Sequence, residues 1–266
     1  MLEKKFPFCF SLDNLIHSEN FLNFCCNFFI THINQKYIFM GHCPKNLSKS
    51  YLEQNIDNIK DFEYFWNNRE INQIDNFLRE KKYSRLFEWL SVRILLKIGL
   101  PLYWKFVSTN LNVSQKNIVL SKNKWNKPFI NIISESNFDY IPFISISHSK
   151  KDIFIALSSL PIGIDCEQIS SYSINLINKI FTEQELTKFL NNFGKKIKIS
   201  DEMIYTLMYS LKEATLKLIT NSSIGMISKI SIQLLNDSIL TKYHNNCQNY
   251  KGFISLIEDS VLTVVM

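Results

Sequence analysis

Residues 162–167 read Ile-Gly-Ile-Asp-Cys-Glu, and this stretch indicates the architecture of the second half of the chain. Strand alternation puts Gly163, Asp165 and Glu167 on one face and Cys166 on the other. Two residues apart along a strand is about 6.6 Å. Carboxylates at that spacing can close on one cation such as Mg²⁺, and Gly163 leaves room beside them for a ligand. The alternative is an edge strand whose acidic face is exposed to solvent.

A third carboxylate lies far along the chain, in residues 209–217, which read Tyr-Ser-Leu-Lys-Glu-Ala-Thr-Leu-Lys. Helical spacing puts Glu213 and Lys217 one turn apart on one face, with Tyr209 on the same stripe. Three carboxylates and an amine that converge suit a divalent cation and phosphate chemistry. Taken alone, Glu213 and Lys217 are better explained as a surface ion pair.

Two further segments carry groups that suit phosphate. Ser147 and His148 end a predicted strand and enter a turn, where hydroxyl and imidazole groups can bind phosphate oxygens. A Ser–His–acid hydrolase is an alternative, but the chain lacks a GxSxG elbow, and an ordinary loop histidine is another. Residues 126–128, Asn-Lys-Pro, place a cation at a rigid turn or form an ordinary loop.

A basic helix is predicted over residues 75–98, because apolar residues recur at helical spacing and Gly99-Leu100-Pro101 should end it. Arg79, Arg85 and Arg93 fall within about four turns of this helix, although the chain has only four arginines. Arginine binds phosphate bidentately, so the cluster suits an anionic ligand. Its alternative is a solvated helix face.

The remaining patterns predict an α+β chain with two halves of similar content. The residues before the basic helix are expected to form strands at 26–33 and 36–40, joined by a turn at Asn34-Gln35, and a polar stretch at 44–69 with a short helix or loop. Further strands are predicted at 117–120, 129–133, 143–147, 153–157, 162–166, 230–234, 252–257 and 261–265, and helices at 173–180, 183–191 and 201–220. Thr182 and Glu185 fit a capping box. The seam at 158–161 divides an N-terminal half, 1–160, from a C-terminal half, 161–266.

Composition narrows the class of protein. The 266 residues are 46% hydrophobic and 20% charged, which excludes a disordered chain. The net charge of +6 favours acidic partners, namely a protein, a phosphorylated cofactor or nucleic acid, or reflects a lysine-rich surface. The six cysteines have no CxxC pair or zinc-site spacing, so we expect reduced thiols, mostly buried. With no signal sequence or membrane span visible, a cytoplasmic protein is expected.

The order of these motifs resembles that of the 4′-phosphopantetheinyl transferase superfamily, which carries a GKP-like turn, an ISHS strand end, a GIDIE strand and a WxxKEAxxK helix. The matching segments are Asn126–Pro128, Ile146–Ser149, Gly163–Glu167 and Tyr209–Lys217, with Phe181–Glu185 similar to an FxxxE element and Ser84–Arg93 to a REWLAVR-type helix. The chain looks like the long, two-halved branch that includes the surfactin-synthetase-activating enzyme. Asn126 replaces the turn glycine, which is tolerable because asparagine adopts positive φ. Tyr209 replaces tryptophan.

The resemblance implies two similar halves related by a pseudo-twofold axis, each a small antiparallel sheet packed with helices, and an active site between them. The reaction would transfer the 4′-phosphopantetheine arm of coenzyme A to a serine of an apo acyl or peptidyl carrier protein, releasing adenosine 3′,5′-bisphosphate. Asp165, Glu167 and Glu213 would hold Mg²⁺. Glu213, Lys217, Asp165 and His148 would be catalytic. The coenzyme A contacts would come from Arg85, Arg93, Lys127, Pro128, Ser147 and His148.

The carrier would belong to fatty-acid, polyketide or nonribosomal peptide synthesis, and its acidic surface would suit the basic balance of this chain. The branch implies a monomer with no membrane or nucleic-acid partner. Three alternatives stay open from the sequence. They are another Mg²⁺-dependent enzyme acting on a phosphorylated nucleotide, a basic nucleic-acid-binding protein, and an inactive relative.

Overall fold

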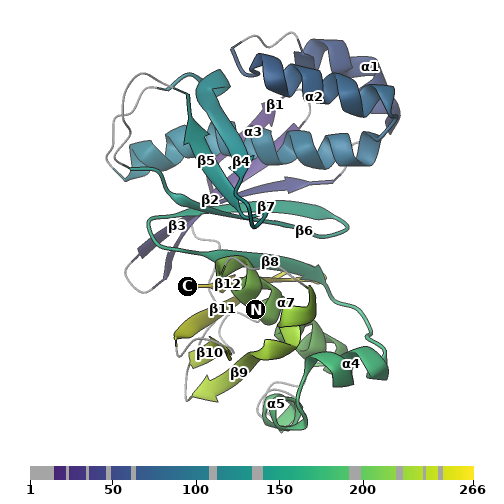
Figure 1. Ribbon diagram of the computed structural model, residues 1–266, viewed down its shortest axis with the longest axis vertical. Coiled ribbons are helices and arrows are strands. Elements are labelled where there is room, and N and C mark those ends of the chain that lie inside the picture. The colour runs from purple at the N-terminus through teal and green to yellow at the C-terminus, as the bar shows by residue number, and fades with distance from the viewer. Residues whose placement is uncertain are drawn as a thin grey trace.

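The computed structural model describes residues 15–21, 24–33, 36–45, 49–60, 64–107, 113–133, 140–191, 199–219, 224–235, 238–244 and 248–266. Within these ranges the strands form two five-stranded antiparallel sheets and one separate hairpin. Figure 1 shows the N-terminal half above the C-terminal half, with strands β6 and β8 lying where the two halves meet. None of the described helices is both long enough and apolar enough to cross a membrane.

The N-terminal sheet has the strand order β1-β2-β3-β7-β6, and helix α3 packs across β3 and β7. The hairpin β4–β5 lies beside this sheet, next to β6. The elements of this half are β1 (Leu15–Phe21), β2 (Phe24–Ile33), β3 (Lys36–Pro44), α1 (Lys49–Lys60), α2 (Asn68–Arg79), α3 (Tyr83–Phe106), the 3₁₀ helix η2 (Gln115–Asn117), β4 (Ile118–Lys122), β5 (Pro128–Ile132), β6 (Phe143–His148) and β7 (Asp152–Ser158).

The C-terminal sheet has the strand order β8-β12-β11-β10-β9, and helix α7 packs mainly on β8 and β12. The elements of this half are β8 (Gly163–Gln168), α4 (Ile174–Ile180), α5 (Glu183–Phe189), α7 (Asp201–Ile219), the 3₁₀ helix η4 (Ile224–Lys229), β9 (Ile230–Leu235), β10 (Ser238–Tyr243), β11 (Asn249–Ile257) and β12 (Ser260–Val265). The α+β fold with two sheet-containing halves is therefore confirmed.

The two halves share one topological unit. In the first, β3, α3, β6 and β7 follow one another with sheet order β3-β7-β6; in the second, β8, α7, β11 and β12 follow with order β8-β12-β11. In both units the long helix packs on the first and last strands. The pseudo-twofold rotation and the domain boundary at 160–161 remain predictions.

A central core lies between the two sheets. It contains apolar side chains from β3 and β7 on one side and from β8 and β12 on the other, including Met40, Phe154, Ile164, Cys166 and Leu262. The molecule thus has helices outside and two sheets inside. Cys166 faces this core, so the prediction that it lies on the opposite strand face from Asp165 is confirmed.

The prediction of a single helix over 75–98 was wrong at both ends. The chain forms α2 and then α3, which continues through Gly99 and Pro101 to Phe106. A proline within a helix costs about 3 kcal/mol, but here tertiary contacts outweigh that cost. Beyond Pro101, Tyr103 and Trp104 are buried, and both hydrogen-bond Tyr140. Gly99 lies inside the helix and does not end it. A glycine is needed there because the sheet approaches closely, and a Cβ would lie 3.0 Å from the Phe28 ring.

Other expectations had mixed outcomes. The polar stretch 44–69 contains the twelve-residue helix α1 and the start of α2. Strand β10 was missed because Thr241, a polar residue, occupies a buried position and is satisfied by Thr215 at 2.8 Å. The capping box of Thr182 and Glu185 is confirmed. The predicted turn at Asn34-Gln35 lies outside the described residues, while Cys26, Cys43 and Cys166 are buried as expected.

Candidate active site

The two halves meet along β6 and β8, which are edge strands of different sheets. Serine side chains bridge them in place of a backbone ladder. Ser145 Oγ accepts a hydrogen bond from Ile164 N at 3.0 Å, and Ser147 Oγ accepts one from Cys166 N at 2.9 Å. The alternation of β6 explains this, because residues two apart share a face. The bridges place the end of β6 directly beside Asp165.

Asp165 is the centre of a three-residue cluster drawn from both halves. Its Oδ1 accepts from Lys217 Nζ at 2.8 Å and from Ser147 Oγ at 3.0 Å, and Lys217 Nζ also donates to Ser147 Oγ at 3.0 Å. Asp165 is only 3% exposed. The predicted convergence of β8 and α7 is thus present in the structure, and β6 joins them.

Glu167 and Glu213 complete an acidic group around Asp165. Burial, and then the charge of Asp165, raises the pKa of Glu167 to about 7. Burial and Asp165 also raise the pKa of Glu213, whose Oε1 accepts from Tyr209 Oη at 3.3 Å. Both shifts have the sign expected of half-buried carboxylates that repel one another. The group therefore holds excess negative charge that a bound cation would neutralise.

The donor set fits a hard divalent cation, although the described residues contain no three His, Cys, Asp or Glu side chains already gathered as a metal site. Asp165 Oδ2 is buried and has no hydrogen-bond partner. A buried, unsatisfied carboxylate oxygen is costly unless a ligand occupies it. Carboxylate oxygens are also the ligands that Mg²⁺ prefers. The fit rests on this free oxygen and on the two neighbouring glutamates.

Gly163 does not leave room for a ligand, so that expectation was wrong. A Cβ at this position would lie 1.9 Å from the carbonyl oxygen of Ala214 and 2.9 Å from Leu218 N, both in the backbone of α7. The glycine is needed because strand β8 and helix α7 approach each other closely there. Its role is to bring Asp165 and Lys217 together.

The predicted phosphate ligands of the N-terminal half lie around this cluster in different ways. His148 is exposed at the end of β6, and desolvation of its ring lowers its pKa. Lys127 reaches across from the β4–β5 turn and donates to the carbonyl oxygen of Leu218 at 2.8 Å, at the end of α7. Asn126 has φ 61°, which confirms that asparagine replaces the turn glycine in a left-handed conformation. Pro128 begins β5 and is half-buried.

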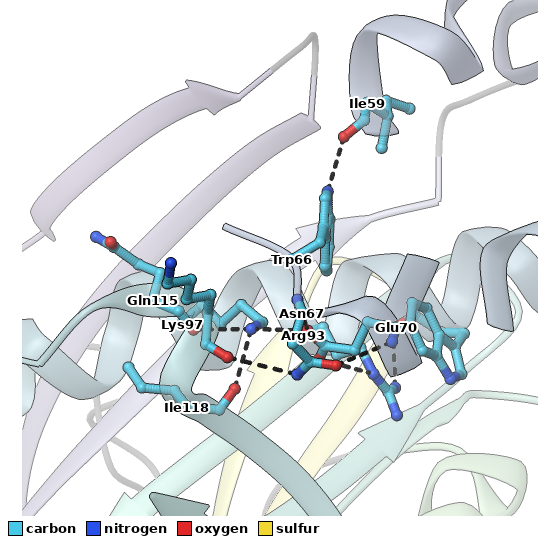
Figure 2. A network of polar contacts seen from close by, with 10 residues as sticks. Ile59, Trp66, Asn67, Glu70, Arg93, Lys97, Gln115 and Ile118 are labelled. Atoms are coloured by element: carbon cyan, nitrogen blue, oxygen red, sulfur yellow. Dashed lines mark hydrogen bonds and ion pairs between the residues drawn. The ribbon is translucent and has the colours of Figure 1, made fainter. Parts of the chain in front are cut away.

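The structure does not bring Arg93 into this cluster. Its guanidinium stacks over Trp89 at 3.6 Å and lies 3.6 Å from Glu70 Oε1, in the network that Figure 2 shows between α2 and α3. Burial lowers the pKa of Arg93 to about 10. Arg85 is exposed on α3, one turn before Glu88, whose charge reaches His148. Among the described contacts, none joins Arg85 to the cluster, and its charge acts on Glu80.

The sequence reasoning missed two polar pairs of the structure, one beside His148 and one that holds α7. Lys45 forms an ion pair with Glu88, and both charges act on His148. Lys212 is buried and donates to Glu185 Oε2 at 3.1 Å and to the Ile180 carbonyl at 2.9 Å. Glu185 therefore anchors α7 as well as capping α5. The dipeptide Lys212-Glu213 was one signal for the second pair. Adjacent helical residues point to different sides of the helix, so Lys212 needs a partner of its own away from the face of Glu213.

Comparison with known proteins shows which family the C-terminal half resembles. Residues 161–265 match the family model described as the 4′-phosphopantetheinyl transferase superfamily. The C-terminal half is therefore similar to this superfamily. The matched range contains Asp165, Glu167, Glu213 and Lys217, whereas Ser147 and His148 lie before it.

A similar curated protein is the 4′-phosphopantetheinyl transferase gsp of Aneurinibacillus migulanus. It is 28% identical over 158 residues, which is 56% of this chain. The match spans 62% of that relative's length. The range that matches the family model contains two of the four motifs, Gly163–Glu167 and Tyr209–Lys217.

Proposed function

We propose that this chain is a 4′-phosphopantetheinyl transferase, which moves the 4′-phosphopantetheine arm of coenzyme A to a serine of an apo acyl or peptidyl carrier protein. Adenosine 3′,5′-bisphosphate would be the second product. The observation that carries the proposal is the cluster of Asp165, Lys217 and Ser147 at the seam between the halves. The family match over the C-terminal half and the related transferase add support.

The acidic group is where a divalent cation would bind. Asp165, Glu167 and Glu213 would hold Mg²⁺, which when bound supplies charge stabilisation to a pyrophosphate undergoing substitution. The buried free oxygen of Asp165 and the raised pKa of Glu167 support these ligands.

The protein's own groups would handle the proton and the leaving group. The raised pKa of Glu213 makes it a stronger base than an exposed glutamate, so it suits proton removal from the carrier serine. The ammonium of Lys217 is held between Asp165 and Ser147 and would neutralise negative charge that develops on the departing phosphate.

Coenzyme A would lie against the N-terminal side of the seam. His148 is exposed there, and Lys45 adds positive charge beside it. Arg85 is exposed on α3 and would add a further cation for the phosphates. Lys127 and Pro128 form the turn that reaches the end of α7. The net charge of +6 would favour an acidic carrier surface at the docking step.

The test is intact-protein mass spectrometry of an apo acyl carrier protein that has been incubated with the chain, coenzyme A and Mg²⁺. We expect a mass gain of one phosphopantetheine that requires the metal. Glu213→Gln should abolish the gain while unfolding at the wild-type temperature. The matched control is Glu183→Gln, an exposed glutamate of α5 away from the cluster.

Near-normal transfer by Glu213→Gln would contradict the role of Glu213. No transfer by the wild-type chain to fatty-acid, polyketide or peptide carriers would contradict the proposal as a whole. Turnover of a small phosphorylated nucleotide in its place would favour a different Mg²⁺-dependent enzyme. Salt-sensitive binding to RNA or DNA that Glu213→Gln leaves unchanged would favour a nucleic-acid-binding protein.

A further inference from the structure

Ser147 has a hydrogen-bonding arrangement that distinguishes it from the other polar groups around the cluster. Its hydroxyl donates to Asp165 Oδ1 at 3.0 Å and accepts from Cys166 N at 2.9 Å and Lys217 Nζ at 3.0 Å. A serine hydroxyl has one donor and two acceptor sites, so all of its capacity is used. The side chain is also only 1% exposed. It has neither a free proton nor a free surface to offer a ligand.

These three contacts join parts of the chain that are far apart in sequence. Cys166 N fixes the hydroxyl against β8, and the hydroxyl in turn fixes one carboxylate oxygen of Asp165 and the ammonium of Lys217 on α7. Because Oδ1 is held by Ser147 and Lys217, the plane of the carboxylate is set. Oδ2 is then the oxygen that remains buried and without a partner.

We infer that Ser147 is a positioning residue, which orients Asp165 so that Oδ2 is presented to a divalent cation and keeps Lys217 beside it. Ser147 does not contact the phosphates of the substrate; the neighbouring exposed His148 is the group of this strand end that can do so. This inference rests on the proposed function, because it concerns the same cation site.

The chain contains a matched control for this role. Ser145 lies two residues earlier on the same strand face, is 3% exposed, and accepts from Ile164 N at 3.0 Å across the same seam. The structure gives Ser145 no hydrogen bond to a carboxylate or an ammonium group among the described contacts. Replacing either serine by alanine removes one bridge to β8, but only Ser147→Ala removes the hold on Asp165 and Lys217.

The experiment measures two binding constants on the full, metal-free chain. Mn²⁺ is titrated alone and followed by electron paramagnetic resonance, and coenzyme A is titrated without metal by calorimetry. Loss of a residue that orients a metal ligand typically lowers metal affinity about 10–100-fold. We therefore expect Ser147→Ala to raise the Kd for Mn²⁺ at least ~10-fold, and Ser145→Ala and Ser147→Thr to stay within ~3-fold of the wild type. The metal-free Kd for coenzyme A should change little in Ser147→Ala.

Equal Kd values for Mn²⁺ in Ser147→Ala and Ser145→Ala, with a wild type that binds Mn²⁺, would overturn the positioning role and leave the proposed function standing. A weaker metal-free affinity for coenzyme A with unchanged Mn²⁺ binding would instead make Ser147 a phosphate ligand. A wild type that does not bind Mn²⁺ would overturn both the positioning role and the cation site. If Ser147→Ala is too unstable to titrate, Ser147→Cys, which has only a weak donor, replaces it with the same expectations.

Discussion

Replacing Gly163 by alanine should separate strand β8 from helix α7 and thereby disassemble the cluster. The added Cβ would lie 1.9 Å from the carbonyl oxygen of Ala214, whereas ordinary contact begins at 3.4 Å, so the two backbones must separate by 3.4 − 1.9 = 1.5 Å. The obstructing atom belongs to a helix backbone, so no side-chain rotation can relieve the contact. Lys217 Nζ, now 2.8 Å from Asp165 Oδ1, would move out of hydrogen-bond distance if α7 shifted that far.

We expect Gly163→Ala to lower the free energy of unfolding by about 1–3 kcal/mol, the usual cost of overpacking. The rate of phosphopantetheine transfer should fall about 100-fold, because a misplacement of about 1 Å is enough for such a loss. Urea denaturation and the mass-spectrometric transfer assay measure the two effects. Gly252→Ala is the control, because its Cβ would meet side chains and no backbone atom, with the tip of Leu211 at 2.8 Å and Ile239 Cγ2 at 3.3 Å. A Gly163→Ala protein with wild-type stability and transfer would refute the close approach of β8 and α7.

Two further predictions concern charged groups. In the metal-free chain the pKa of Glu167 is raised from 4.5 to about 7, so its protonated form stabilises the fold at low pH and that stability is lost as pH rises through about 7. The free energy of unfolding of the wild type should therefore decline by on the order of 2 kcal/mol between pH ~5 and ~7.5, and Glu167→Gln should remove this decline. Thermal unfolding at a series of pH values in EDTA measures it, and the same decline in both proteins would contradict the prediction. Lys97→Met should cost about 3 kcal/mol in urea denaturation, because it leaves the buried Glu70 carboxylate and the carbonyls of Gln115 and Ile118 without their shared donor. An unchanged urea midpoint would show that this network does not hold α2, α3 and the start of β4 together.

The sequence was sufficient for the fold class and for the acidic centre. Alternation in β8 and helical spacing in α7 are local rules, and they placed Asp165, Glu167, Glu213 and Lys217 on the faces that the structure shows. The positive φ of Asn126 was also foreseeable, because few residues other than glycine adopt it readily.

What could not be predicted depends on contacts between distant segments. From the sequence alone, the missing side chain of Gly163 suggests room for a ligand. In the structure the backbone of α7 fills that space. From the sequence alone, Arg93 is a candidate phosphate ligand. In the structure its guanidinium lies beside Glu70 of α2 and stacks on Trp89 of α3. The continuation of α3 through Pro101 depends in the same way on contacts with Tyr140. Local propensity carries no information on such contacts.

The serine bridges between β6 and β8 also bear on how this chain avoids aggregation. Each strand is the outermost member of its own sheet, and an uncovered outer strand readily pairs with a strand of another molecule. Here the amide groups of Ile164 and Cys166 are occupied by hydroxyls, so these donors are not offered to a foreign strand. If the halves came apart during folding or heating, both edges would be exposed together, and the chain would be most prone to self-association in that state.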